Sequence, residues 1–168
     1  MRRAVFALVV LAFIAGCPKK KNKATDEDGV FQSRAFKFKH GELPAAWVRA
    51  QVDGTALAFD NKALGATITA FSNCKDIEDI SLRALVQQEL VGVEKKEVVE
   101  QLDTPMEGRE AADWVVKGAL DGVTIEMELV VLRTGRCVYD MVLVSAPDAF
   151  PAARPDFKKF VDGFEVLP

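Results

Sequence analysis

Apolar and polar residues alternate with a period of two in the first half of the chain, the pattern of strands that bury one face. Phe36 and Phe38 alternate with lysines, and we expect ordered structure to start near Ala35. Two further segments flank Asp53-Gly54, a dipeptide typical of two-residue hairpin turns. Strands are therefore predicted over residues 36–39, 47–52, 55–59, 66–72 and 98–102.

The second half of the chain is richer in strands. Asp121-Gly122 separates two long apolar segments, residues 112–120 and 123–133, and so predicts a second hairpin. A turn at residues 134–136 then leads into a further strand over residues 137–145.

One of these strands carries a change of pattern along its length. From Val123 to Val131 every second residue is apolar, and these residues share one face. The opposite face begins with polar residues, among them Glu126 and Glu128, and we expect it to be the outer face. Val130 and Leu132 make that face apolar further on, which predicts burial on both faces there. The apolar set is Val123, Ile125, Met127, Leu129 and Val131, and the polar set is Thr124, Glu126 and Glu128.

Two segments have apolar residues at helical spacing instead. The first helix is predicted to begin after Asp79 as its N-cap and to stop at Gly92. In the second, Pro147 and Pro151 break the chain and Pro155 begins the helix. The apolar stripes are Leu82, Leu85, Val86 and Leu90 in the first, and Phe157, Phe160, Val161 and Phe164 in the second. Together the elements predict an α+β domain, an antiparallel β-sheet flanked by helices.

The start of the chain has a different pattern. Arg2 and Arg3 precede an apolar run over residues 4–14, two small residues and Cys17. This is the arrangement of a secretory signal, and the run is shorter than the ~20 residues that span a bilayer. Ile14-Ala15-Gly16-Cys17 also resembles the lipobox of bacterial lipoproteins. The resemblance implies that residues 1–16 are removed as a signal peptide and that Cys17 is acylated, which anchors the chain to a membrane lipid.

Residues 17–34 are predicted to be a flexible, lipid-anchored tether, and residues 35–168 a single globular domain. The tether has four lysines followed by acidic residues and almost no apolar surface to bury. Two roles for the lysines stay open, contact with anionic headgroups and a plain soluble spacer. The net charge of −3 becomes −5 once Arg2 and Arg3 are lost with the signal. A mildly acidic product does not indicate a nucleic-acid binder.

Two cysteines remain once Cys17 is assigned to the lipid. Cys74 and Cys137 would meet in an oxidising compartment, where disulfides persist. A disulfide is the preferred interpretation, with two reduced buried thiols or a metal or redox site as alternatives. A metal site would need further ligands, and His40 is the only histidine. A bridge would close a loop of about 64 residues and stabilise the fold by roughly 4 kcal/mol.

The remaining candidates have ordinary structural explanations, and no catalytic or metal-binding residue is assigned. His40 is expected to be a solvated loop residue and not a ligand or base. Asp76, Glu78 and Asp79 could bind a divalent cation, but they are better explained as favouring a helix N-terminus. No serine lies in a Gly-x-Ser-x-Gly context, which leaves nucleophilic hydrolysis without support. The serines considered are Ser72, Ser81 and Ser145.

The large aromatic residues and one arginine pair leave a ligand site open. Trp47, Trp114 and Tyr139 could stack on a ligand, although core packing explains them better. Arg133 and Arg136 flank a glycine at a hairpin tip, where they could bind an acidic partner or be ordinary turn residues. The ligand-binding residues therefore stay unknown, and no cofactor is expected.

Both ends of the domain resemble the PsbP-like family. Phe36-x-Phe38 and the Leu-Pro-Ala-Ala-Trp of residues 43–47 resemble the opening of these domains, with Ala46 in place of the usual glycine. The strand over residues 137–145 and the following Pro155-x-Phe157 helix resemble the family's end. The resemblance extends to DcrB-like envelope lipoproteins and implies an α/β/α sandwich. It also implies a non-enzymatic accessory or assembly role. The photosystem members of the family help retain Ca²⁺ and Cl⁻, but no residue here matches an ion site.

These observations predict a membrane-tethered, non-enzymatic lipoprotein of the bacterial cell envelope that binds another envelope protein or supports complex assembly. The alternative is a small-ligand or ion-binding carrier or sensor, which would need a sizeable pocket lined by one of the aromatic residues. An enzyme is the least supported reading. The expected partners are membrane lipid, through acylated Cys17, and an envelope protein, with no nucleic acid.

Overall fold

The computed structural model describes residues 24–33, 36–52, 56–75, 80–103 and 109–168. Several predicted features lie outside these ranges. They are the signal sequence, the lipobox with Cys17, the Asp53-Gly54 turn and the acidic residues Asp76, Glu78 and Asp79.

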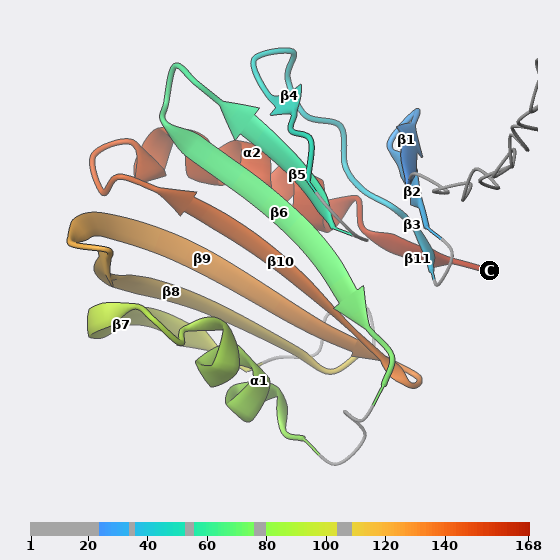
Figure 1. Cartoon of the computed structure of the whole chain (residues 1–168). Coiled ribbons are helices and arrows are strands. Elements are labelled where there is room, and N and C mark those ends of the chain that lie inside the picture. Colours follow the sequence, from blue (N-terminus) through green and yellow to red (C-terminus); the bar gives the residue numbers. More distant parts are fainter. Residues whose placement is uncertain (1–23, 34–35, 53–55, 76–79, 104–108) are drawn as a thin grey trace, which may run out of the picture.

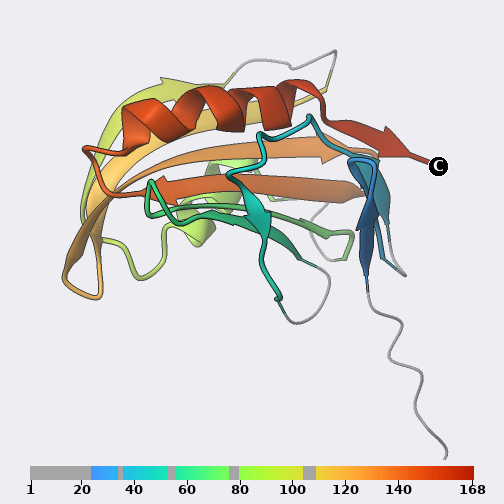
Figure 2. The same ribbon diagram turned by 90° about the horizontal axis from the view of Figure 1, so that it is seen from above.

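A seven-stranded antiparallel sheet forms the middle layer of the molecule, with the strand order β4-β5-β6-β10-β9-β8-β7 (Figure 1). Two helices lie on opposite faces of this sheet, α1 at Leu82–Glu89 and α2 at Phe150–Asp162 (Figure 2). The strands are β4 (Val48–Arg49), β5 (Leu57–Asn61), β6 (Ala66–Asn73), β7 (Glu94–Leu102), β8 (Ala111–Leu120), β9 (Val123–Thr134) and β10 (Cys137–Ser145). This arrangement confirms the predicted α+β class, an antiparallel sheet flanked by helices.

The sheet separates two hydrophobic cores, as the pattern of β9 predicts. Leu129 and Val131 belong to the core under α1, whereas Val130 and Leu132 belong to the core under α2. Successive side chains of a strand point to opposite faces, so a run of consecutive apolar residues indicates burial on both sides. The Asp121-Gly122 hairpin is also confirmed, with both residues at positive φ as a type I′ turn requires.

A second, smaller sheet packs at one end of the molecule, in the order β1-β2-β3-β11 (Figure 1). Its strands are β1 (Thr25–Glu27), β2 (Val30–Gln32), β3 (Lys37–Lys39) and β11 (Glu165–Leu167). Phe31 of β2 is fully buried and its ring lies 5.1 Å from that of Phe38. The prediction that ordered structure starts near Ala35 is therefore wrong. Hydrogen bonding to β3 and the burial of Phe31 stabilise strands that are too short and polar to form alone.

Both helices begin elsewhere than predicted. Ser81, and not Asp79, is the N-cap of α1, since its side chain accepts a hydrogen bond from the Ala84 N–H. Helix α2 begins at Phe150, and Pro155 lies inside it. Pro151 occupies the first turn, where a missing N–H costs nothing, so the chain turns helical before Pro155. The predicted apolar stripe of α2 is buried as expected.

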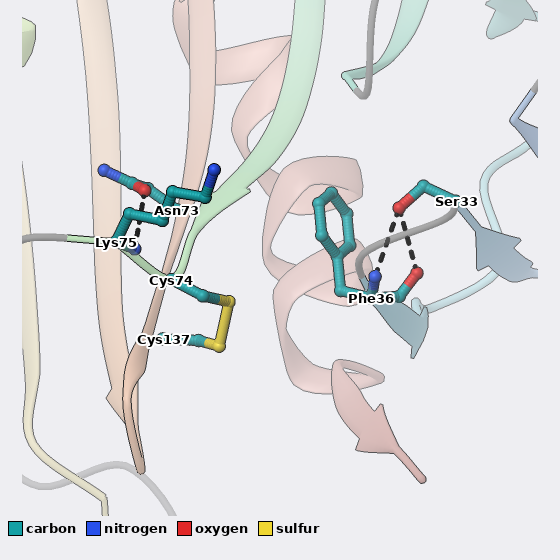
Figure 3. The surroundings of a disulfide bond; sticks show 6 residues. All are labelled: Ser33, Phe36, Asn73, Cys74, Lys75 and Cys137. Carbon is teal, nitrogen blue, oxygen red and sulfur yellow. Dashed lines mark hydrogen bonds between the residues drawn. A yellow bond between two sulfur atoms is a disulfide. The ribbon is translucent and has the colours of Figure 1, made fainter.

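The structure contains the disulfide between Cys74 and Cys137, which joins the end of β6 to the start of β10 (Figure 3). Asn73 pairs with Val138 in these antiparallel strands, so the next residue along β6 faces Cys137. The Cα atoms of the two cysteines are 4.0 Å apart. Near the bridge, Ser33 Oγ accepts from the Phe36 N–H and donates to the Phe36 carbonyl (Figure 3). The structure thus agrees with the disulfide, which the sequence analysis prefers over two reduced thiols or a metal or redox site.

Candidate functional site

A cavity of about 660 Å³ opens where the small sheet meets the end of α2. Its walls come from the β1–β2 turn, the chain that follows β3, one residue of β5 and the residue after α2. The lining residues are Asp26, Asp28, Gly29, Lys39, His40, Gly41, Glu42, Leu43, Trp47, Phe59 and Gly163. This volume is within the range that small-molecule sites occupy in proteins. We call it the His40 pocket.

His40 lies in the wall of this pocket and is only 5% exposed, so the prediction of a solvated loop histidine is wrong. Its ring stacks on that of Phe160, with centroids 4.7 Å apart, and meets Phe59 edge-on. A sequence signal for this burial exists. His40 continues the alternation of Phe36 and Phe38, so the same face of β3 carries it into the core.

Both ring nitrogens of His40 meet oxygen atoms. Nδ1 lies 2.9 Å from the main-chain oxygen of Gly41, and Nε2 lies 3.1 Å from Asp26 Oδ1. A carbonyl oxygen only accepts, so Nδ1 carries a hydrogen and donates it. Asp26 belongs to β1, and the His40–Asp26 contact therefore fastens the first ordered strand to the body of the domain.

Two glycines allow the chain after β3 to cross the end of α2. A Cβ atom on Gly41 would lie 1.8 Å from the Lys159 carbonyl oxygen, and one on Gly163 would lie 2.4 Å from the Gly41 Cα. No larger residue fits at either position without moving the backbone. The Gly41 N–H donates to the Phe160 carbonyl, which fixes the crossing that shapes one wall of the pocket.

Trp47 forms part of the apolar wall. Its indole Nε1 donates to Asp156 Oδ2 on α2 at 3.0 Å, which holds the ring in one orientation. Trp114 and Tyr139 lie away from this pocket, in the cores under α1 and α2 respectively. Core packing, which is the preferred explanation, thus holds for Trp114 and Tyr139. Trp47 belongs to the core under α2 and also lines the pocket.

A second group of charged residues lies between α2 and the sheet. Glu128 of β9 is 0% exposed, although the sequence predicts it on an outer face, and that prediction is wrong. Arg154 Nε and Lys158 Nζ, one helical turn apart on α2, reach its carboxylate at 2.9 and 3.0 Å. We call Glu128, Arg154, Lys158, Asp113 and Glu100 the Glu128 cluster.

Two further carboxylates extend the ion pairs of this cluster. Arg154 also pairs with Glu100 of β7 at 2.6 Å, and Lys158 lies 3.5 Å from Asp113 Oδ2. Burial, followed by the nearby charge of Glu128, raises the pKa of Asp113 to about 6. Two cations thus face three carboxylates, so the cluster keeps one negative charge in excess when all three are ionised, and its ion pairs fix the helix on the sheet.

An acidic pair lies on the other face of the sheet, and no cation among the described residues forms an ion pair with it. Asp140 of β10 is 5% exposed, and burial, together with the charge of Glu89 on α1, raises its pKa to about 7. Burial also raises the pKa of Glu89.

The other sequence candidates are dispersed. Ser81 caps α1, Ser145 Oγ donates to the Ala146 carbonyl, and the Ser72 hydroxyl is buried in β6. Arg133 donates to the Ile80 carbonyl and lies 3.8 Å from Glu110, so it has a local role beside the hairpin tip. Within the described ranges, no three His, Cys, Asp or Glu side chains are arranged to hold a metal ion. No helix in these ranges is long and apolar enough to cross a membrane.

Comparison with known proteins identifies the fold. No family model and no curated protein sequence matches the chain. Among 24 matching chains of solved structures is the PsbP protein (CyanoP) of Synechocystis, with a TM-score of 0.56 and 12% identity. That match covers 92% of this chain and 99% of the other.

Two further matches have the same level of identity. A Pseudomonas aeruginosa protein of unknown function, PA94, has a TM-score of 0.52 and 13% identity, over 86% of this chain and 98% of the other. LpqN, involved in cell envelope biogenesis of Mycobacterium tuberculosis, has a TM-score of 0.46 and 12% identity, over 78% and 83%. The likeness to CyanoP shows that this chain has a PsbP-like fold.

Proposed function

We propose that this chain is a lipid-anchored, non-enzymatic protein of the bacterial cell envelope that binds another envelope protein and supports the assembly of its complex. Two features support the proposal, the lipobox at Cys17 and the PsbP-like fold. The observation that carries it is that ordered structure begins close to the proposed anchor, with β1 at Thr25–Glu27.

The distance from anchor to domain limits where the domain can work. Six residues, 18–23, lie between Cys17 and Ala24, and a fully extended chain over these seven Cα–Cα steps reaches at most about 25 Å. An acylated Cys17 would therefore hold the small sheet and the His40 pocket next to the membrane surface. Confinement to this layer raises the effective concentration of the domain for membrane proteins beside it.

The anchor is tested by comparing the wild-type protein with Cys17→Ser in its native host. We expect the wild-type protein to fractionate with membranes and to gain mass from acyl groups after loss of residues 1–16. Cys17→Ser should leave the membrane fraction and carry no acyl mass. A variant that stays acylated and membrane-bound would overturn the anchor.

The partner is tested by purifying the native lipoprotein in a mild detergent and quantifying the proteins that accompany it. We expect one or two envelope proteins at near-stoichiometric amounts, and their loss when the Cys17→Ser protein is purified in the same way. An accompanying set identical to that of an unrelated lipoprotein would contradict the proposal.

A second candidate function is that of a small-ligand carrier or sensor, and the His40 pocket favours it. The pocket has one of the aromatic walls that this alternative requires, at Trp47. Native mass spectrometry of the purified protein tests it. A reproducible added mass that disappears on denaturation supports a carrier, whereas an unloaded protein from every growth condition counts against it.

A further inference from the structure

The His40 pocket has an uneven set of polar groups. Several of its hydrogen-bond donors are used within the fold. The main-chain N–H groups of His40, Gly41 and Gly163 donate to the carbonyls of Gly29, Phe160 and Lys159. Both nitrogens of the His40 ring and the Trp47 indole N–H are likewise engaged. An anion could pair with Lys39 but would also meet the carboxylates of Asp28 and Glu42.

The carboxylate acceptors of the pocket, in contrast, are mostly unpaired within the described part of the chain. Asp28 and Glu42 line it and are exposed, and neither makes a hydrogen bond or ion pair within the part of the chain that the structure describes. Asp26 is matched by His40. Lys39 lies directly opposite Glu165 in the pairing of β3 with β11, so an acid from outside the pocket faces it across the strands. Asp28 and Glu42 still outnumber Lys39, so the lining keeps an excess of one carboxylate.

Behind this acidic opening, the pocket wall is apolar. Leu43, Trp47 and Phe59 supply it, and Trp47 is held in place by its bond to Asp156. An aromatic wall and nearby carboxylates together favour a cation, which the ring face attracts and the carboxylates neutralise. An inorganic cation would leave the apolar wall unused, whereas a cationic group on an apolar stem would cover both parts.

We propose that the His40 pocket binds an ammonium or guanidinium group carried on an apolar stem, with Asp28 and Glu42 pairing with the charge and Leu43, Trp47 and Phe59 covering the stem. Two sources have this chemistry, a lysine or arginine side chain of a protein partner and a free organic amine. The site itself does not depend on the proposed function, and only the protein source does.

Titration of the full mature lipoprotein in a non-ionic detergent with n-pentylamine tests the site directly. The indole N–H resonance of Trp47 reports on the pocket, and calorimetry measures the affinity. We expect saturable binding with a dissociation constant of about a millimolar, as is usual for so small a ligand. Pentan-1-ol, which has the same stem without charge, and pentanoate, which has the opposite charge, should bind at least about tenfold more weakly.

Two matched variants separate the pocket from the general charge of the protein. Asp28→Asn/Glu42→Gln should weaken pentylamine binding roughly tenfold. Asp121→Asn/Glu97→Gln removes the same charge from residues that do not line the pocket and should leave binding unchanged. The proposal is overturned if wild-type protein shows no saturable binding, if pentanoate or pentan-1-ol binds equally well, or if both variants bind like the wild type.

The same two variants identify the source of the cation. Loss of a co-purifying envelope protein from Asp28→Asn/Glu42→Gln, but not from the control, would assign the pocket to a basic side chain of that partner. Retention of the partner, together with weakened pentylamine binding, would assign it to a free amine. If no partner exists at all, the proposed function fails while the pentylamine result still decides the site.

Discussion

The His40 pocket and the Glu128 cluster both bring acidic side chains near α2. Only the Glu128 cluster is closed, in the sense that its carboxylates are paired with cations of the fold. Around Glu128, two cations from α2 satisfy carboxylates from three strands, and the central carboxylate is fully buried. At the pocket, two carboxylates stay exposed beside an apolar wall and have no partner among the described residues. Charges that the fold has already paired fix the structure, and charges that it leaves unpaired are available to a ligand.

The largest effect should come from breaking the closed cluster. Arg154→Ala leaves Glu128 buried with only Lys158 to balance it, and we expect the free energy of unfolding to fall by about 3 kcal/mol. Urea denaturation with the disulfide intact measures this. Lys62→Ala removes a cation from an exposed turn and should change the free energy by less than about 0.5 kcal/mol. Equal losses in the two variants would show that the Glu128 cluster contributes no more than any surface charge.

The next effect should come from the part of the pocket that the fold does use. His40→Ala removes the ring that stacks on Phe160 and leaves Asp26 without a partner, and we expect a loss of about 2 kcal/mol. A double-mutant cycle with Asp26→Asn should give a coupling energy of about 1 kcal/mol. Amide exchange in β1 and β2 should accelerate more than in β9. An additive cycle would mean that the pair does not fasten β1.

The same two regions show what the sequence could predict. Local signals were sufficient where a segment determines its own structure, as in the Asp121-Gly122 hairpin and the doubly apolar end of β9. They failed where the partner is distant in the sequence. Glu128 is buried only because Arg154 and Lys158 dock over it, and helical spacing on α2 does not show which strand they will meet.

The pocket was missed because its first wall was assigned to the tether. Residues 25–32 are polar apart from Gly29, Val30 and Phe31. They form strands because β1 pairs with β2 and β2 with β3, which also pairs with β11. One local signal was present. Asp28-Gly29 is the first of four Asp-Gly dipeptides in the chain, and its positive φ angles match those of the Asp121-Gly122 turn.

A third arrangement of acids lies under α1 and sharpens the comparison, because Asp140 is buried and no cation in the described part of the chain pairs with it. Its folded pKa of about 7 lies above the unfolded value of 3.8, so the folded state holds the proton more tightly. The stability from this group is complete below pH 3.8 and is lost as the pH rises through 7. Asp113, with a pKa of about 6, likewise reduces the stability of the folded state as the pH rises.

Asp140→Asn should remove much of this pH dependence. The amide never has to ionise inside the protein, so we expect the variant to be more stable than the wild type by about 2 kcal/mol at pH 8. Near pH 4.5 the two proteins should differ little. Urea unfolding at pH 4.5, 6 and 8 measures both differences. A constant difference across the three values would show that Asp140 does not titrate in this range.

The smallest effect on stability should come from the open acids of the pocket. Asp28 and Glu42 have no partner within the described part of the chain, and removing an exposed, unpaired charge costs little. Asp28 also lies at positive φ, a conformation that asparagine adopts as readily. We therefore expect Asp28→Asn/Glu42→Gln to unfold within about 0.5 kcal/mol of the wild type in the same urea series. A loss that approaches that of Arg154→Ala would mean that these carboxylates hold the fold together after all, and the distinction between closed and open charges would fail.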